Sequence, residues 1–268
     1  MRRRGHTATL TLSVALLSAG CASQGAEAIA CPLDDNGQHA VTVLVESRVS
    51  GDRLSGGRAA VCGDGPAAQA LLARARRMRD RIDPPLRPQR VDVHLVAAGR
   101  GLEYHRRGHA LLASPDAVQL HDSVWLHELA HVRMGRSPRG DGFARAWQEA
   151  LEEGIADYHA AAVSGQPQLG PFGNRRRSKR DLARAPPVAA GDWESLALPN
   201  VDFDPHRLGW SFAGAAWRAE PRSGELLADL LACGEQPVPS HWLQSCPVRS
   251  RARIEALLRG WMPAELLR

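Results

Sequence analysis

The chain has 268 residues, of which 44% are hydrophobic and 24% are charged. This length and composition exclude an intrinsically disordered chain and fit one well-packed domain or two lobes that share a cleft. The formal net charge of +5 includes Arg2, Arg3 and Arg4, and it falls to +2 if these three residues are removed. So small an excess does not indicate a nucleic-acid partner. The densest basic cluster, Arg175–Arg180, follows a Gly- and Pro-rich stretch and predicts an exposed loop, with a subsite for acidic substrates as the alternative.

The N-terminus has the three-part pattern of a secretory signal. Three arginines precede an apolar run from about Thr7 to Leu17, and small residues follow up to Cys21. The apolar run is too short for a membrane-spanning helix. We therefore predict an exported protein in which residues 1–20 are a signal peptide and residues 21–30 are a linker.

The end of this signal, Leu17-Ser18-Ala19-Gly20-Cys21, resembles the lipobox of bacterial lipoproteins. The resemblance implies that Cys21 is lipidated, becomes the mature N-terminus and anchors the protein to a bacterial membrane, facing the periplasm or the exterior. Ordinary cleavage after Ala26-Glu27-Ala28 is the alternative, and it would release a soluble periplasmic or secreted protein.

The cysteine count agrees with this interpretation. If Cys21 carries lipid, the other four of the five cysteines form an even set. Export implies an oxidising compartment, in which such sets form disulfides. Of three possible connectivities we expect pairing between neighbours in the sequence, Cys31–Cys62 and Cys233–Cys246, and the alternative is four buried thiols.

The N-terminal half alternates between strand and helix patterns. Residues 39–51 are rich in β-branched side chains and predict a strand, residues 66–82 begin with Pro and predict a helix, and residues 90–97 alternate like a half-buried strand. Residues 108–122 predict two short strands around a Ser-Pro-Asp turn. We therefore predict an α+β fold whose N-terminal lobe, residues 31–136, holds a small mixed sheet.

The C-terminal half is expected to be mainly helical over residues 137–268. A helical pattern covers residues 142–165 and stops at Ser164-Gly165, and another begins at residue 204 with Asp204 as the cap and Pro205 in the first turn. Two further helical patterns cover residues 225–233 and 251–261.

The stretch His127-Glu128-Leu129-Ala130-His131 carries the strongest chemical signal. Residues four apart share one face of a helix, so the two histidines can bind one metal ion, with Glu128 beside them. Residues 123–135 fit such a helix, and Ser123 is its expected cap. A catalytic zinc ion needs three protein ligands, so a third ligand decides whether this motif is a metal site.

The next predicted helix offers acidic side chains for this purpose. Glu153 follows the second histidine by 22 residues, and Asp157 is one turn further on. Because the two share a face, one can reach the metal while the other accepts the outer N–H of His127. Glu149 lies on the same face and Glu152 is adjacent. A solvated acidic surface is the alternative interpretation of this run.

The histidine motif followed at this spacing by Glu153-Gly154-Ile155-Ala156-Asp157 resembles the gluzincins, the thermolysin-like zinc metallopeptidases. The resemblance covers roughly residues 108–217 and implies a zincin-like fold with the histidine motif on its active-site helix. It implies one Zn²⁺ per chain with three protein ligands: His127, His131 and Glu153. It also implies that Glu128 is the general base and that Asp157 supports a zinc-bound histidine. The residue before the ligand Glu is often Asn in the family and is Glu152 here.

A third segment, residues 204–217, resembles the gluzincin segment in which a His leans into the cleft to stabilise the transition state. His206 and Gly209 occupy the corresponding positions. The alternative is that His206, in the first turn of a helix, is a surface residue. Tyr104 and Tyr158 are further candidates for oxyanion donors, although Tyr158 is more typical of a packing residue.

Together the patterns predict an exported zinc metallopeptidase that hydrolyses peptide bonds with zinc-activated water and Glu128 as the base. Its expected partners are a peptide or protein substrate and, through Cys21, a membrane, but not nucleic acid. Residues 108–113 near the motif would pair with an extended substrate or form an ordinary structural strand. One alternative is a catalytically silent zincin-fold lipoprotein that acts as a binding module and does not need Glu128. Another is a hydrolase of cell-wall peptides.

Overall fold

The structure is a computed structural model, and its described residues belong to one compact unit, Cys31–Arg268. It describes these residues: 41–50, 53–61, 66–88, 90–95, 101–106, 109–135, 138, 140, 142–171, 179–189, 192–193, 204–236 and 238–267. The expected signal peptide, linker, lipidated Cys21 and Cys31–Cys62 pair lie outside them. Within this described part of the chain, no helix has the length and apolar character needed to cross a membrane.

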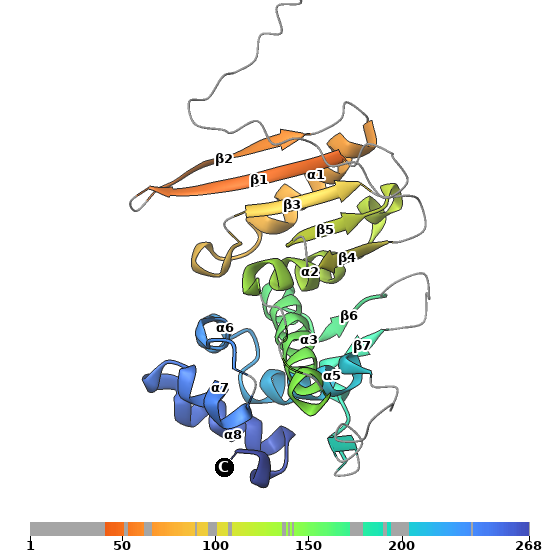
Figure 1. Cartoon of the computed structure of the whole chain (residues 1–268). Helices are drawn as coiled ribbons and strands as arrows, with labels where there is room; N and C mark the ends of the chain where they lie inside the picture. The colour runs from red at the N-terminus through yellow and green to blue at the C-terminus, as the bar shows by residue number, and fades with distance from the viewer. Residues whose placement is uncertain are drawn as a thin grey trace, which may run out of the picture. The chain divides into compact units, whose positions relative to one another are not determined.

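Five strands form one mixed sheet in the order β2-β1-β3-β5-β4 (Figure 1). Strands β3 and β5 are parallel, whereas the other neighbours are antiparallel. The predicted α+β class is therefore confirmed, although the sequence patterns did not predict β2 and β4. The strand bounds are β1 Val41–Ser50, β2 Arg53–Val61, β3 Arg90–Leu95, β4 Leu102–His105 and β5 Ala110–Ala113.

Six of the described α-helices follow the predicted order, whereas α7 and a second, two-stranded sheet of β6 and β7 were not predicted. The α-helices are α1 Pro66–Asp80, α2 Asp122–Met134, α3 Gly142–Ser164, α5 Pro205–Ala219, α6 Gly224–Ala232, α7 Pro239–Ser245 and α8 Arg251–Trp261. The 3-10 helices are η1 Pro84–Leu86, η2 Pro115–Gln119, η3 Leu182–Arg184, η4 Val248–Ser250 and η5 Ala264–Leu267. The short strands are β6 Gln168–Leu169 and β7 Arg180–Asp181.

Two predicted helix ends agree with the structure. Helix α3 stops at Gly165, which has φ +74°, a left-handed conformation that glycine adopts without strain. Helix α5 begins after Asp204, whose side chain accepts a hydrogen bond from the backbone N–H of His206. This cap fixes the first turn of α5, and with it the backbone of His206.

Residues 108–122 contain one strand rather than the predicted two. The segment after the Ser-Pro-Asp turn is the 3-10 helix η2, because Pro115 has no N–H for a sheet and has a φ suited to the first turn of a helix. The expectation that residues 108–113 could form a substrate-binding edge is also wrong. Strand β5 lies inside the sheet between β3 and β4, so β4 is the edge strand on this side.

Helix α2 begins at Asp122, two residues earlier than a Ser123 cap implies, and Ser123 is not its cap. His121 is the N-cap, since its Nδ1 accepts a hydrogen bond from the backbone N–H of Ser123. The Ser123 hydroxyl instead accepts a hydrogen bond from the backbone N–H of Gly170 at 2.9 Å. This contact ties the start of α2 to the segment after α3.

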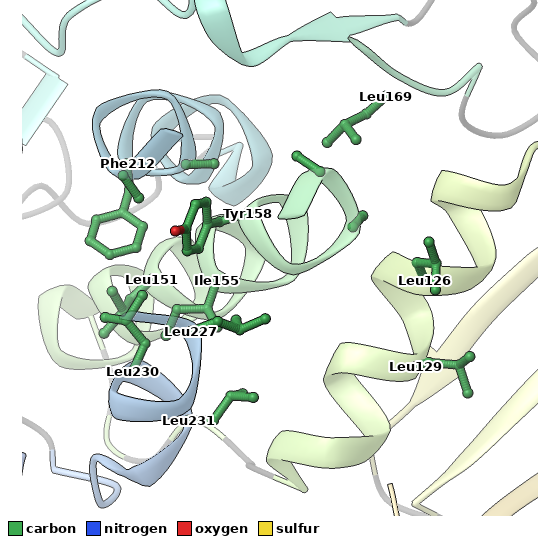
Figure 2. Close-up of a cluster of buried hydrophobic side chains, with 14 of the residues drawn as sticks. Leu126, Leu129, Leu151, Ile155, Tyr158, Leu169, Phe212, Leu227, Leu230 and Leu231 are labelled. Atoms are coloured by element: carbon green, nitrogen blue, oxygen red, sulfur yellow. The ribbon is translucent and has the colours of Figure 1, made fainter. Parts of the chain in front are cut away.

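Helices α2, α3, α5 and α6 contribute to one hydrophobic core (Figure 2). The buried side chains in this region include Leu126, Leu129, Leu151, Ile155, Tyr158, Phe212, Leu227 and Leu230. Burial of each large apolar side chain stabilises the fold by about 1.5–3 kcal/mol. Tyr158 is fully buried and donates its hydroxyl hydrogen bond to Glu220 O at 2.7 Å, so it packs the core, as the alternative interpretation had it.

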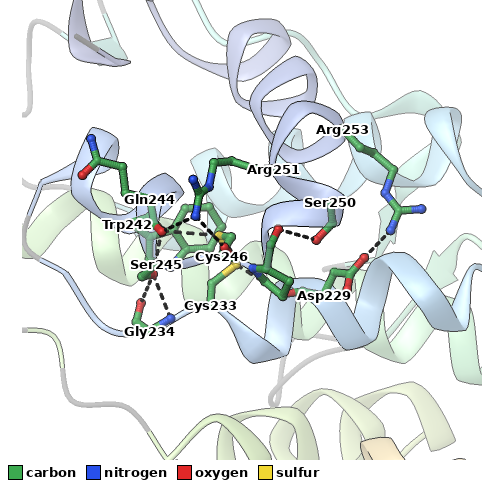
Figure 3. Close-up of a disulfide and its surroundings, with 11 residues drawn as sticks. Asp229, Cys233, Gly234, Trp242, Gln244, Ser245, Cys246, Ser250, Arg251 and Arg253 are labelled. Carbon is green, nitrogen blue, oxygen red and sulfur yellow. Dashed lines mark hydrogen bonds and ion pairs between the residues drawn. A yellow bond between two sulfur atoms is a disulfide. The ribbon is translucent and has the colours of Figure 1, made fainter.

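Cys233 and Cys246 form the expected disulfide, which links the ends of α6 and α7 (Figure 3). The two cysteines are 13 residues apart in the sequence. Closing a loop of about this length stabilises the folded state by roughly 3 kcal/mol through the entropy of the unfolded chain. Arg251 donates hydrogen bonds to Gln244 O and Cys246 O and connects this loop to α8.

Candidate metal centre

Helices α2 and α3 bring the two histidines and one glutamate of the sequence motifs together. His127 and His131 project from successive turns of α2, as their spacing of four requires, and Glu153 projects from α3. All three side chains are buried, with exposed fractions of 2%, 5% and 6%. Their ligand atoms lie within 4.8 Å of one another, so the group can hold a metal ion.

The distances within this group fit a single small cation. The two histidine Nε2 atoms are 3.2 Å apart. Glu153 Oε2 is 3.1 Å from His127 Nε2, and Glu153 Oε1 is 3.5 Å from His131 Nε2. Bonds of about 2.0–2.1 Å in tetrahedral geometry place ligand atoms roughly 3.3–3.4 Å apart. The two carboxylate distances involve different oxygens of Glu153, and one ligand atom from each of the three residues lies within 4.8 Å of the other two, which is close enough for all three to contact one metal ion.

Asp157 holds the ring of His127 through Nδ1, the nitrogen that does not face the other candidate ligands. The two groups are joined by a hydrogen bond of 2.8 Å between His127 Nδ1 and Asp157 Oδ1. Because an ionised carboxylate only accepts, Nδ1 carries a proton, and Nε2 is the ring nitrogen that faces the other two candidate ligands. Asp157 is fully buried, and its Oδ2 accepts a hydrogen bond of 2.5 Å from Arg180 Nη1, with which it forms an ion pair.

The electrostatics of the group favour a cation. Burial alone would lower the pKa of His127, but the carboxylates of Asp157 and Glu153 raise it to about 10. Burial would likewise raise the pKa of Glu153, but His131 and His127 hold it well below its ordinary value. Glu153 Oε2 is buried and lies near His127 Nε2 and His206 Nε2, but it makes no hydrogen bond with the described residues. A bound metal ion would satisfy this oxygen and replace the proton on His127.

Glu128 lies beside the metal-binding group but outside it. Its Oε2 accepts a hydrogen bond from the backbone N–H of Tyr104, on strand β4, at 2.8 Å. Burial raises the pKa of the Glu128 carboxyl, which moves it toward the range of an effective general base at neutral pH.

His206 lies next to the third candidate ligand. Its Nε2 is 3.4 Å from Glu153 Oε2, and its side chain is 49% exposed. Two glycines let α5 approach α3 this closely, since a Cβ on Gly154 would be 2.7 Å from Gly209 O and one on Gly209 would be 2.7 Å from Gly154 N. Gly154 and Gly209 therefore allow α3 and α5 to pack closely.

Two arginines beside the centre were not identified from the sequence. Arg180 belongs to the cluster interpreted as an exposed loop, but the structure places its mostly buried side chain on Asp157, so that interpretation is wrong for this residue. Arg106 follows β4, and one of its nitrogens is 3.4 Å from Glu152 Oε2 and 3.8 Å from Glu153 Oε1. Both arginines reach α3 from distant parts of the chain, and no local pattern signals such contacts.

We expect Asp157→Asn to weaken metal affinity by about 10–100-fold, because the amide keeps a hydrogen bond to His127 but loses the charge that supports it and that pairs with Arg180. Competition between the protein and a metal chelator of known affinity measures this change. Glu149→Gln is the control and should bind metal like the parent protein, since Glu149 is not in the metal-binding group. Unchanged affinity in Asp157→Asn would show that Asp157 only stabilises the fold.

Comparison with known proteins adds no assignment. No family model matches the chain, and neither the curated proteins nor the solved structures contain a match. The fold and the site define a mixed α+β protein with a buried His-His-Glu group that can hold a metal ion.

Proposed function

We propose that the protein is an exported zinc-dependent metallopeptidase with a zincin-like fold and a gluzincin-type centre. The observation that carries this proposal is the position of Glu128. A site that only stores a metal ion or stabilises a fold needs metal ligands alone. This site also has the half-buried carboxylate of Glu128 beside the candidate ligands, and that carboxylate accepts a hydrogen bond from the backbone N–H of Tyr104. A peptidase uses such a carboxylate as its general base.

The donor set supports zinc as the metal, with one ion per chain. Two imidazoles and one carboxylate, here His127, His131 and Glu153, are a ligand set typical of catalytic zinc, and three protein ligands leave a fourth position open. Bound zinc would lower the pKa of a water molecule toward ~7 and polarise the scissile carbonyl group.

The chain's own residues supply the proton transfer and the charge stabilisation. Glu128 Oε2 is engaged by the Tyr104 N–H, so Oε1 is the oxygen that accepts the proton of the attacking water and passes it to the leaving amine. In this proposal His206, half exposed beside Glu153, donates a hydrogen bond to the tetrahedral oxyanion.

We expect His206→Ala to lower kcat by about a hundredfold or more while KM and zinc content stay close to the parent values, because the oxyanion contact exists only in the transition state. Steady-state kinetics and metal analysis of the same preparation check this. Arg207→Ala is a matched control, since Arg207 is the exposed neighbour of His206 on α5 and pairs with Asp192. Loss of zinc from His206→Ala would make His206 a ligand, and full activity would make it a surface residue.

An unbiased peptide library tests the proposed function directly. The mature protein should cleave library peptides, lose this activity on treatment with a chelator and regain it when zinc is restored. If the zinc-loaded protein cleaves no peptide, the silent binding module is the correct class. If it cleaves only cell-wall peptides, the protein is a cell-wall hydrolase.

We also propose that the mature protein is a lipoprotein held on a bacterial membrane through Cys21, which rests on the lipobox-like sequence. The Cys233–Cys246 disulfide supports export, since disulfides persist in oxidising compartments. Cys21→Ser should move the protein from the membrane fraction to the soluble fraction. An unmodified N-terminus between Gln24 and Ile29, seen by mass spectrometry, would instead identify a soluble exported protein.

A further inference from the structure

The edge strand β4 presents one backbone N–H toward the metal centre. Gly101 O accepts a hydrogen bond from Ser114 N, which makes residues 101 and 114 a hydrogen-bonded pair at the start of the β4–β5 ladder. Hydrogen-bonded pairs alternate with non-bonded pairs along an antiparallel ladder. Tyr104, opposite Leu111, is therefore in a non-bonded pair, and its N–H points away from β5.

This outward N–H donates to Glu128 Oε2 at 2.8 Å. The bond joins strand β4 to helix α2 across 24 residues of sequence. It engages one carboxylate oxygen and leaves the other for proton transfer. A long, flexible side chain that must accept a proton in one geometry gains from being held before the substrate arrives.

The side chain of Tyr104 makes a second contact with the same helix. Its ring stacks on the ring of His131, with ring centroids 5.8 Å apart and planes 6° from parallel. Its hydroxyl shares a hydrogen bond of 2.9 Å with His109 Nδ1. Tyr104 thus contacts both a candidate metal ligand and the candidate base, through different groups.

We propose that Tyr104 is a positioning residue, and that its backbone N–H holds the Glu128 carboxylate in the orientation needed for proton transfer. The inference rests on the proposed function, because it assigns to Tyr104 the orientation of the general base. An extended peptide cannot pair with β4 through the Tyr104 N–H, since Glu128 already occupies that donor.

A set of three substitutions separates the backbone contact from the side chain. Tyr104→Pro removes the N–H, and the edge position tolerates Pro because this N–H is not part of the sheet ladder. Tyr104→Ala is its matched control, since it also lacks the ring but keeps the N–H. Tyr104→Phe lacks only the hydroxyl.

Relative to Tyr104→Ala, we expect Tyr104→Pro to lower kcat by about 10–100-fold with KM and zinc content unchanged, as displacement of a catalytic group by about 1 Å does. Tyr104→Phe keeps the backbone N–H and the ring, so it should not reproduce the loss of kcat seen in Tyr104→Pro. Equal kcat in the Pro and Ala variants would overturn the proposal. A large loss in Tyr104→Phe would also overturn it, because the hydroxyl would then be the functional group.

Amide hydrogen exchange tests the contact without relying on activity or on the proline variant. The Tyr104 amide should be protected in the parent protein and exchange at least about tenfold faster in Glu128→Ala, while the amide of Leu112, inside the sheet, is unchanged. The same Tyr104 exchange rate in both proteins would overturn the proposal. If the parent protein cleaves no peptide, the proposed function fails, and this measurement still decides whether Tyr104 holds Glu128.

Discussion

Glu153→Ala is expected to abolish metal binding and, with it, all peptide hydrolysis. The substitution removes one of three ligands and leaves two imidazoles 3.2 Å apart without the carboxylate that balances the charge of the ion. Metal analysis of the purified variant after dialysis against zinc checks this. Circular dichroism shows whether the variant is folded, which matters because Glu153 is buried.

The neighbouring glutamates on α3 are matched controls. Glu149→Ala and Glu152→Ala each remove a carboxylate that contacts Arg106 but is not in the metal-binding group, so both variants should retain about one zinc ion per chain. If Glu153→Ala also retains zinc at the parental level, Glu153 is not the third ligand. If Glu152→Ala loses zinc while Glu153→Ala keeps it, the two glutamates have exchanged roles and the gluzincin assignment fails.

Features that depend on neighbours in the sequence could be predicted. The shared face of His127 and His131, the stop at Gly165 and the cap at Asp204 follow from the geometry of one helix. The disulfide joins cysteines close in sequence. The alternation of Val91 and Val93 also matches their burial in β3.

Features that depend on contacts between distant segments could not be predicted. Ser123 has the chemistry of a cap, but its hydroxyl is engaged by Gly170, and His121 takes the cap position. Strand β4 has only four residues, and its position at the edge depends on its pairing with β5. For the same reason the contact of Arg180 with Asp157 has no counterpart in any local pattern.

The centre draws on three separate segments, and each supplies a different function. Helix α2 supplies two candidate ligands and the candidate base, α3 supplies the third candidate ligand and the carboxylate that contacts His127, and the backbone of β4 donates a hydrogen bond to the candidate base. The resemblance to gluzincins names residues on α2, α3 and α5, but none on β4. The orientation of Glu128 is set by the third segment.

Glu128→Gln is the most specific test of chemistry at this centre. Glu128 is outside the metal-binding group, so the variant should retain about one zinc ion per chain. Gln has nearly the same shape, and its amide oxygen can still accept the hydrogen bond from the Tyr104 N–H, so the fold and the position of the side chain should be preserved. The amide cannot take a proton from water, and kcat should therefore fall by about 10²–10⁴-fold.

Kinetics with a library-derived peptide and metal analysis of the same sample measure both parts of this prediction. Glu103→Gln is a matched control on the exposed neighbour of Tyr104 in β4, and it should hydrolyse the peptide at the parental rate. Peptide binding to Glu128→Gln without turnover would agree with a base that acts only in the chemical step. Parental kcat in a zinc-loaded Glu128→Gln protein would rule out the proposed mechanism, because no proton acceptor would remain at the position beside the ligands.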